Sequence, residues 1–141
     1  MNQGLNFFVG KNGQGKSNLM EALYALSIGK SFRTSNNRNL FNKDTDLNEL
    51  NIFGMAHQNN NVFDLSINLN RIDDSSKIEK VYIYNSSVVK SSDFIGKLNI
   101  VFFEAKDLDI IIGSPSYRRR FLDIHISQQD ISYLKSLQRY N

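Results

Sequence analysis

The chain has 141 residues, 40% of them hydrophobic, which suits one globular domain with a sizeable core. Its formal net charge of +3 permits a nucleic-acid partner without requiring one. The absence of cysteine excludes disulfides and thiolate metal sites. No apolar run approaches the ~20 residues of a membrane-spanning helix, and Met1–Val9 does not resemble a secretory signal, so we expect a cytoplasmic protein with no membrane partner.

The first predicted elements are a strand and a helix joined by a glycine-rich loop. Leu5–Val9 is a short apolar run rich in β-formers and predicts a buried strand. Ser17–Ile28 follows the helical period, and Gly29 suits its C-cap. The apolar positions that should share one helix face are Leu19, Met20, Ala22, Leu23 and Leu26.

A strand-rich region is predicted in the middle of the chain. Lys30–Lys43 is polar and basic, and it predicts a loop with a short helical turn. Asn51–His57 and Val62–Leu69 flank the polar stretch Gln58–Asn61, which indicates a β-hairpin. Ile78–Tyr84 alternates sufficiently to predict a third strand.

The last third of the chain predicts mainly helices. Ser91–Lys97 reads as a short helix, and Leu98–Phe103 as another buried strand. Pro115, the only proline, suits the first turn of a helix. Tyr117–Ile126 and Ile131–Tyr140 are then predicted to be helical.

A phosphate-binding motif lies between the first predicted strand and helix. The pattern G-x-x-x-x-G-K-[ST] is matched at every fixed position by residues 10–17. Glycines allow backbone N–H groups to curl around phosphate oxygens, and the helix start favours the same anion. We expect Lys16 to reach the β- and γ-phosphates of ATP and the Ser17 hydroxyl to bind Mg²⁺. The predicted ATP-binding residues are Gly10, Lys11, Asn12, Gly13, Gln14, Gly15, Lys16 and Ser17.

Three blocks of this sequence resemble the RecF family, a group within the SMC-like ABC-type ATPases. They are residues 5–22, which include the phosphate loop, Gly29–Thr34, and Gly113–Asp123 with its Ser-Pro and three arginines. Residues 42–96 match only in their strand-rich character. The resemblance implies an α/β P-loop NTPase head of the ABC type, present in part as an N-terminal fragment. Residues 1–113 would form an ATPase lobe with an antiparallel strand layer, and residues 114–141 would begin a helical lobe.

The resemblance also implies a function in DNA replication, recombinational repair and the SOS response. Family members bind ATP, single-stranded DNA and gapped duplexes, and support recombinase loading with recombination mediator proteins. In the complete family ATP drives homodimerisation, and hydrolysis is slow. Because this chain lacks the Walker B, signature and switch-histidine motifs, no catalytic residue is assigned in it.

The chain departs from the family pattern at several points. The strand and turn that usually precede the position of Leu5 are missing, Lys11 stands where an acid is common, and Ala105-Lys106 replaces Pro-Glu. The last change weakens the expectation that this segment senses a γ-phosphate. Leu98–Phe103 followed by Glu104 superficially resembles a Walker B strand, but the order of the blocks argues against it. We expect part of the apolar surface to lack a partner.

Two basic stretches are candidate DNA contacts, because such side chains bind phosphates without reading bases. Consecutive arginines on a helix point about 100° apart, so at least one of the three is expected in an internal ion pair or stacked on an aromatic ring. Surface ion pairing is the alternative to DNA contact for this stretch. Possible acidic partners are Asp107, Asp109 and Asp123. The candidate DNA-binding residues are Lys30, Arg33, Arg38, Arg118, Arg119 and Arg120.

Two other functions remain open from the sequence. One is a different P-loop ATPase, such as an ABC transporter subunit, but this chain lacks the upstream base-stacking aromatic and the Gln-containing loop of that class. The other is a degenerate, non-catalytic fragment. A metal role is not expected for His57 or His125, which have no ligand spacing around them.

Overall fold

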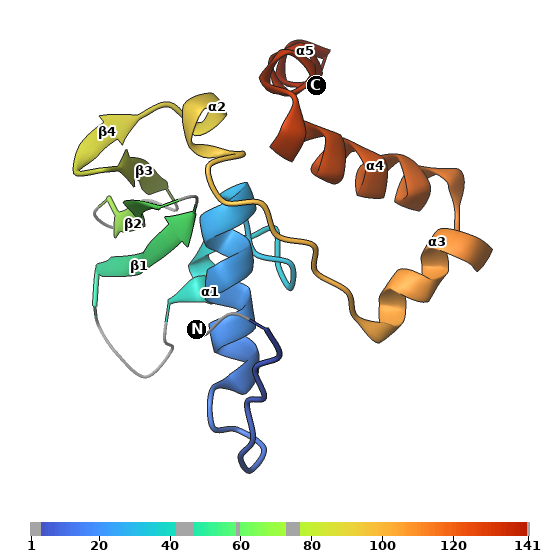
Figure 1. The fold of residues 1–141 in the computed structure, drawn as a ribbon, viewed down its shortest axis with the longest axis horizontal. Helices are drawn as coiled ribbons and strands as arrows, with labels where there is room; N and C mark the ends of the chain where they lie inside the picture. The colour runs from blue at the N-terminus through green and yellow to red at the C-terminus, as the bar shows by residue number, and fades with distance from the viewer. Residues whose placement is uncertain (1–3, 42–46, 59, 73–76, 141) are drawn as a thin grey trace.

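One helix, α1 (Lys16–Ile28), lies between a small β-sheet and the C-terminal helices (Figure 1). The computed structural model describes residues 4–41, 47–58, 60–72 and 77–140, which form a mixed α/β fold. The sheet strands are β1 (Glu49–Gln58), β2 (Asn61–Arg71), β3 (Ile78–Tyr84) and β4 (Ser87–Val89). The short helical elements are η1 (Asn37–Leu40), α2 (Ser91–Phe94), η2 (Ala105–Leu108) and α3 (Asp109–Ile112), and the longer ones are α4 (Pro115–Gln129) and α5 (Ile131–Tyr140).

The four strands form an antiparallel sheet in sequence order, β1-β2-β3-β4. This confirms the three predicted strands and the hairpin between the first two, whose ends pair as Gln58 with Asn61. Asn60 adopts a left-handed conformation with φ 65°, which asparagine tolerates in tight turns. Residues 42–46, part of the predicted loop Lys30–Lys43 among them, and Asn59 lie outside the described residues.

The sequence did not predict β4. Its turn residues Asn85 and Ser86 have φ values of 47° and 62°, as in a type I′ turn, which most often carries glycine. Asp64 of β2 holds this turn: its carbonyl oxygen accepts from the Asn85 N–H at 3.1 Å, and its carboxylate from the Ser86 N–H at 3.3 Å. The contacts with Asp64 therefore stabilise this turn, which the pair Asn85-Ser86 would predict only weakly from sequence.

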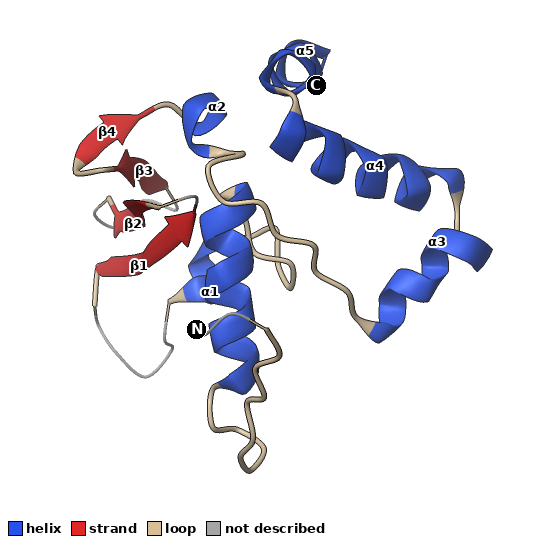
Figure 2. Cartoon of the chain, viewed as in Figure 1, coloured by secondary structure: helices blue, strands red, loops and turns tan. Residues whose placement is uncertain are grey.

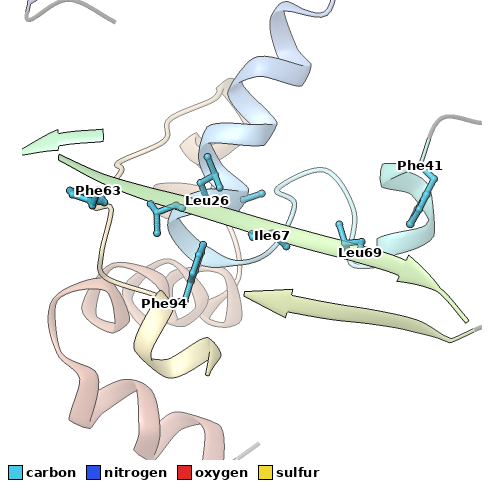
Figure 3. Packing of buried hydrophobic residues seen from close by; sticks show 8 residues of the cluster. Leu26, Phe41, Phe63, Ile67, Leu69 and Phe94 are labelled. Carbon is cyan, nitrogen blue, oxygen red and sulfur yellow. The ribbon is translucent and has the colours of Figure 1, made fainter. Parts of the chain in front are cut away.

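The core lies between β2 and the C-terminal half of α1 (Figure 3). Alternate side chains of a strand point to the same face, so β2 supplies a row of buried apolar residues. Phe94 of α2 also packs in this core and is 0% exposed. The core residues are Ala25, Leu26, Phe41, Phe63, Leu65, Ile67, Leu69 and Phe94.

Helix α1 is buried only along its second half. Tyr24–Ile28 are buried, whereas Leu19 and Met20 remain 37% and 38% exposed. The predicted helix is confirmed, but its predicted apolar face is not covered along its full length. The sheet, α4 and Phe102 reach only the later turns, so the earlier turns project away from the rest of the fold (Figure 1).

Replacing Gly29 with alanine should destabilise the fold. Gly29 ends α1 as predicted, with φ 74° and its N–H bonded to the Ala25 carbonyl at 2.7 Å. An added Cβ would lie 2.9 Å from the Tyr82 ring, and alanine would have to adopt the left-handed backbone conformation that Gly29 has here. We expect a loss of about 1–3 kcal/mol in the free energy of unfolding, measured by urea denaturation. Gly10→Ala, whose Cβ would meet no atom within 4 Å, is the control, and equal midpoints would contradict the argument.

The helices predicted near the C-terminus are confirmed. Pro115 is the first residue of α4, as its fixed φ favours, and α4 begins two residues before the predicted Tyr117. The helix predicted at Ser91–Lys97 is shorter than expected, since α2 ends at Phe94. No helix in the described part of the chain is long and apolar enough to cross a membrane.

Two predicted strands were wrong. Leu5–Val9 and Leu98–Phe103 run as loops (Figure 2), and Leu5, Val9 and Val101 are 82%, 94% and 80% exposed. A strand needs a neighbour to pair its N–H and C=O groups. Among the described residues the only sheet is β1-β2-β3-β4, and it contains neither segment. These apolar, β-prone residues therefore have no neighbouring strand in the described structure. They belong to the unpartnered apolar surface that the sequence predicted.

Candidate nucleotide-binding site

The glycine-rich motif forms an exposed loop that turns directly into α1. Gly13 and Gly15 have φ values of 81° and 80°, which residues with a Cβ adopt at a cost. Gly15 is the N-cap, and its carbonyl accepts the first helical bond from the Leu19 N–H at 3.0 Å. The motif needs a left-handed loop and a helix start, and glycine residues provide both conformations.

Lys16 holds the loop in its curled shape. Its ammonium donates to the carbonyl oxygens of Gly10 at 2.6 Å and Lys11 at 2.7 Å. These bonds bring the side chain back over the loop rather than out into solvent. The cation therefore lies above the same backbone whose N–H groups would face a bound anion.

The start of α1 has the electrostatics of an anion site. No side chain caps it, and the first turn contains no acidic residue, so the N–H groups there are open to an anionic ligand. Ser17 is exposed in this first turn, as are Asn12 and Gln14 in the loop. A phosphate at this position would meet the helix start, Lys16 and the loop amides together.

The segment after α1 folds back toward the loop. Arg33 forms an ion pair with Glu21 at 3.2 Å and donates to the Asn18 side-chain oxygen at 3.0 Å. The Ser31 hydroxyl also donates to Glu21. Arg33, which the sequence grouped with DNA-binding residues, thus lies beside the first turns of α1. Sequence reasoning did not identify Glu21, because nothing in its spacing signals a partner twelve residues later.

The other candidate DNA-binding residues are spread over several elements. Arg118 donates to the Gly113 carbonyl at 3.0 Å, while Arg119 is exposed on α4. Arg38 lies in η1, where its N–H bonds to Asn36 at 3.0 Å. Lys30 and Arg120 line one cavity between α1 and α4. Of the six candidates, the structure therefore places Lys30 and Arg120 at one cavity. The other four do not line it.

The acids that the sequence offered as partners for the arginines have other partners. Asp107 accepts a 2.8 Å hydrogen bond from the Tyr117 hydroxyl, which raises the pKa of Tyr117 to about 12. Asp123 accepts a hydrogen bond from the Tyr133 hydroxyl. Within the described residues, no ion pair joins Asp107, Asp109 or Asp123 to Arg118–Arg120, and DNA contact by this stretch stays a prediction.

The position of Glu104 does not favour a Walker B role. Its carboxylate pairs with Lys106 at 2.6 Å, and the preceding Phe102 packs on Tyr24 with ring centroids 5.7 Å apart. Tyr24 lies eight positions after Lys16 in α1 (24 − 16), which is about 12 Å along a helix. Glu104 is thus beside the middle of the helix rather than at the phosphate loop.

Comparison with known proteins places these features in a family. A model of the AAA domain matches residues 1–140. The chain is 40% identical over 136 residues to proteins named DNA replication and repair protein RecF from Bacillus mycoides, Bacillus cytotoxicus and Bacillus thuringiensis. The matched region covers 96% of this chain and 34 to 35% of those relatives, so the chain spans about a third of their length.

The comparison with solved structures found no match. The family model nevertheless covers nearly the whole chain, and the matched region includes the loop of residues 10–17 and its helix. From this match and the curled, anion-facing loop we conclude that the chain belongs to the AAA domain family and is a homologue of RecF.

Proposed function

We propose that this chain binds ATP through Gly10–Ser17 and is part of a protein that acts in DNA replication and recombinational repair. The observation that carries the proposal is the exposed loop, in which left-handed glycines and the Lys16 ammonium surround an uncapped helix start. The relatives' names supply the DNA-related role, and the AAA domain supplies nucleotide binding. We also propose that the chain forms part of an ABC-type, SMC-like ATPase head. Residues 1–113 would form its ATPase lobe, and residues 114–141 would begin its helical lobe.

Each loop residue has a proposed part in holding the triphosphate. Lys16 would exchange its bonds to the Gly10 and Lys11 carbonyls for bonds to the β- and γ-phosphates. Exposed backbone N–H groups of Gly13–Ser17 would contact phosphate oxygens, and the Ser17 hydroxyl would bind Mg²⁺. Lys16, the helix start and the bound Mg²⁺ would together neutralise the phosphate charge.

The role of the whole protein extends this proposal. It would bind single-stranded DNA and gapped duplexes, dimerise with ATP, and act with recombination mediator proteins in recombinase loading and the SOS response. Phosphate contacts would come from Lys30, Arg33, Arg38 and Arg118–Arg120. Arg33 and Arg118 are already bonded to Glu21 and the Gly113 carbonyl through Nη1, and each guanidinium has further N–H donors for a phosphate.

A titration tests the nucleotide half of the proposal. A fluorescent ATP analogue should bind the chain saturably, more tightly with Mg²⁺ than with EDTA, and unlabelled ATP should displace it. Fluorescence anisotropy measures the affinity, and circular dichroism shows whether the chain is folded. A folded chain that does not bind the analogue would contradict ATP binding by this chain.

The same anisotropy measurement tests the DNA half with a labelled single strand. We expect binding that weakens steeply with salt, as phosphate contacts require. If the chain still binds the ATP analogue but does not bind the DNA strand at low salt, the proposed DNA role of this chain is contradicted and the proposed nucleotide site is not.

A further inference from the structure

A second site lies at the opposite end of α1 from the phosphate loop. A cavity of about 720 Å³ opens between the end of α1, strand β3 and helices α4 and α5. This is within the range of about 300–1,000 Å³ that small-molecule sites occupy. The thirteen residues of α1 span about 20 Å, so the cavity is well separated from Lys16.

Positive charge dominates the lining of this cavity. The lining contains three cations, Lys30, Lys80 and Arg120, and one carboxylate, that of Asp123, which already accepts a hydrogen bond from Tyr133. Three cations with one engaged acid leave a net positive site. The structure thus gathers cations from the end of α1, from β3 and from α4 around one space.

Lys80 is the best-fixed of these cations. Its half-buried ammonium donates to the Gly29 carbonyl at 2.9 Å and to the Asn37 side-chain oxygen at 3.1 Å. Both acceptors are neutral, and an ammonium has three donors, so one donor remains for a ligand. Burial, followed by repulsion from Lys30, lowers the pKa of Lys80.

Ser127 adds an unsatisfied polar group to the wall of this cavity. Its side chain lines the cavity and is 8% exposed, yet its buried hydroxyl has no hydrogen-bond partner among the described residues. The neighbouring Gln128 is fully engaged: its side-chain oxygen accepts from the Ser27 hydroxyl and the Ile100 N–H, each at 2.9 Å. Buried polar groups are nearly always satisfied, so this hydroxyl at the wall of a basic cavity is available to a ligand that brings an acceptor beside it.

The rest of the lining is apolar or aromatic. Tyr82, Ile95, Ile124 and Leu134 border the same space. A bare anion would leave these side chains against water, whereas a ligand with an apolar or ring-shaped part would cover them. The chemistry of the lining therefore fits a phosphate joined to an organic group.

We propose that this cavity binds an organic phosphate of about nucleotide size, with the phosphate between Lys30, Lys80 and Arg120 and a hydrogen bond from Ser127. The ligand is either a free nucleotide or the phosphorylated end of a nucleic-acid strand, since both present the same group. The proposal does not depend on ATP binding at Gly10–Ser17, because no residue is shared between the two sites.

The test uses the Lys16→Ala chain, in which the phosphate loop is disabled. Isothermal titration calorimetry follows three probes: inorganic phosphate, AMP, and a thymidine dinucleotide with a 5′-phosphate. We expect saturable binding of AMP or the dinucleotide, tighter than that of inorganic phosphate. Lys80→Met and Arg120→Met should each weaken it about tenfold or more, as loss of a charged hydrogen bond does. Arg139→Met is the matched control, because Arg139 is an exposed cation of α5 that does not line the cavity.

Ser127→Ala separates ligand binding from a structural role. It should raise the urea midpoint of the free chain, since an unsatisfied buried hydroxyl is removed, and at the same time weaken probe binding several-fold. Binding of AMP alone would identify a free nucleotide, and binding of the dinucleotide alone a strand end. No saturation by any probe in a folded chain would overturn the proposal. So would equal affinity for inorganic phosphate, or affinities that Lys80→Met and Arg120→Met leave unchanged.

Discussion

Lys16→Ala should weaken binding of a fluorescent ATP analogue by about a hundredfold or more. A charge-assisted hydrogen bond contributes about 1.5–3 kcal/mol, and Lys16 would make such bonds to two phosphates. Each 1.4 kcal/mol corresponds to about tenfold in the dissociation constant. The same anisotropy titration with Mg²⁺ measures the change.

Lys11→Ala is the control for Lys16→Ala, because it removes an equal charge from the same loop. Lys11 stands at a variable position of the motif, and only its backbone carbonyl contacts Lys16. Its replacement should change affinity by less than about threefold, as expected for loss of an exposed charge. Equal losses in the two variants would mean that the loop attracts ATP by net charge alone, without a specific Lys16 contact.

Phe94→Ala should produce the largest loss of stability. Phe94 is 0% exposed and packs in the core with Leu65 and Ile67. The centroids of its ring and the Tyr82 ring are 5.0 Å apart. Truncating a buried phenylalanine usually removes about 3–5 kcal/mol from the free energy of unfolding. For a small domain this is a large fraction of the total, so the urea midpoint should fall markedly or the chain should not fold.

Phe53→Ala is the matched control for this core truncation. Phe53 lies in β1 and is 60% exposed, so its ring adds little to the core. Its replacement should change the free energy of unfolding by less than about 1 kcal/mol. A similar effect of the two variants would show that the core does not lie where α2 meets the sheet. If Phe94→Ala does not fold, Phe94→Leu should still lower the midpoint measurably more than Phe53→Leu.

The sequence predicted those elements whose signals are local. Strand-like runs on either side of a polar turn located β1 and β2, and alternation located β3. Helical spacing with Gly29 located α1, and Pro115 marked the start of α4. The phosphate loop was found because its glycines and lysine are adjacent in the chain. These features depend on neighbours within a few residues, which a sequence displays directly.

Features that depend on distant partners were not predicted. Leu5–Val9 and Leu98–Phe103 have the composition of strands, but composition cannot supply the neighbouring strand that pairs their backbone. The basic cavity joins Lys30, Lys80 and Arg120, which are up to ninety positions apart (120 − 30), so no spacing rule connects them. Its orphaned hydroxyl, Ser127, is a common residue with no motif around it.

The uneven burial of α1 has a consequence for how tightly a nucleotide can bind. Its last turns are anchored in the core, whereas in the described structure Arg33 and Ser31 hold its first turns through side-chain bonds to Asn18 and Glu21. Helix ends with few buried contacts fray and exchange their amide hydrogens quickly. A bound triphosphate would have to order these turns, and this entropy would be subtracted from its affinity. Segments that pack on this half of α1 in a longer chain would therefore tighten ATP binding without touching the nucleotide.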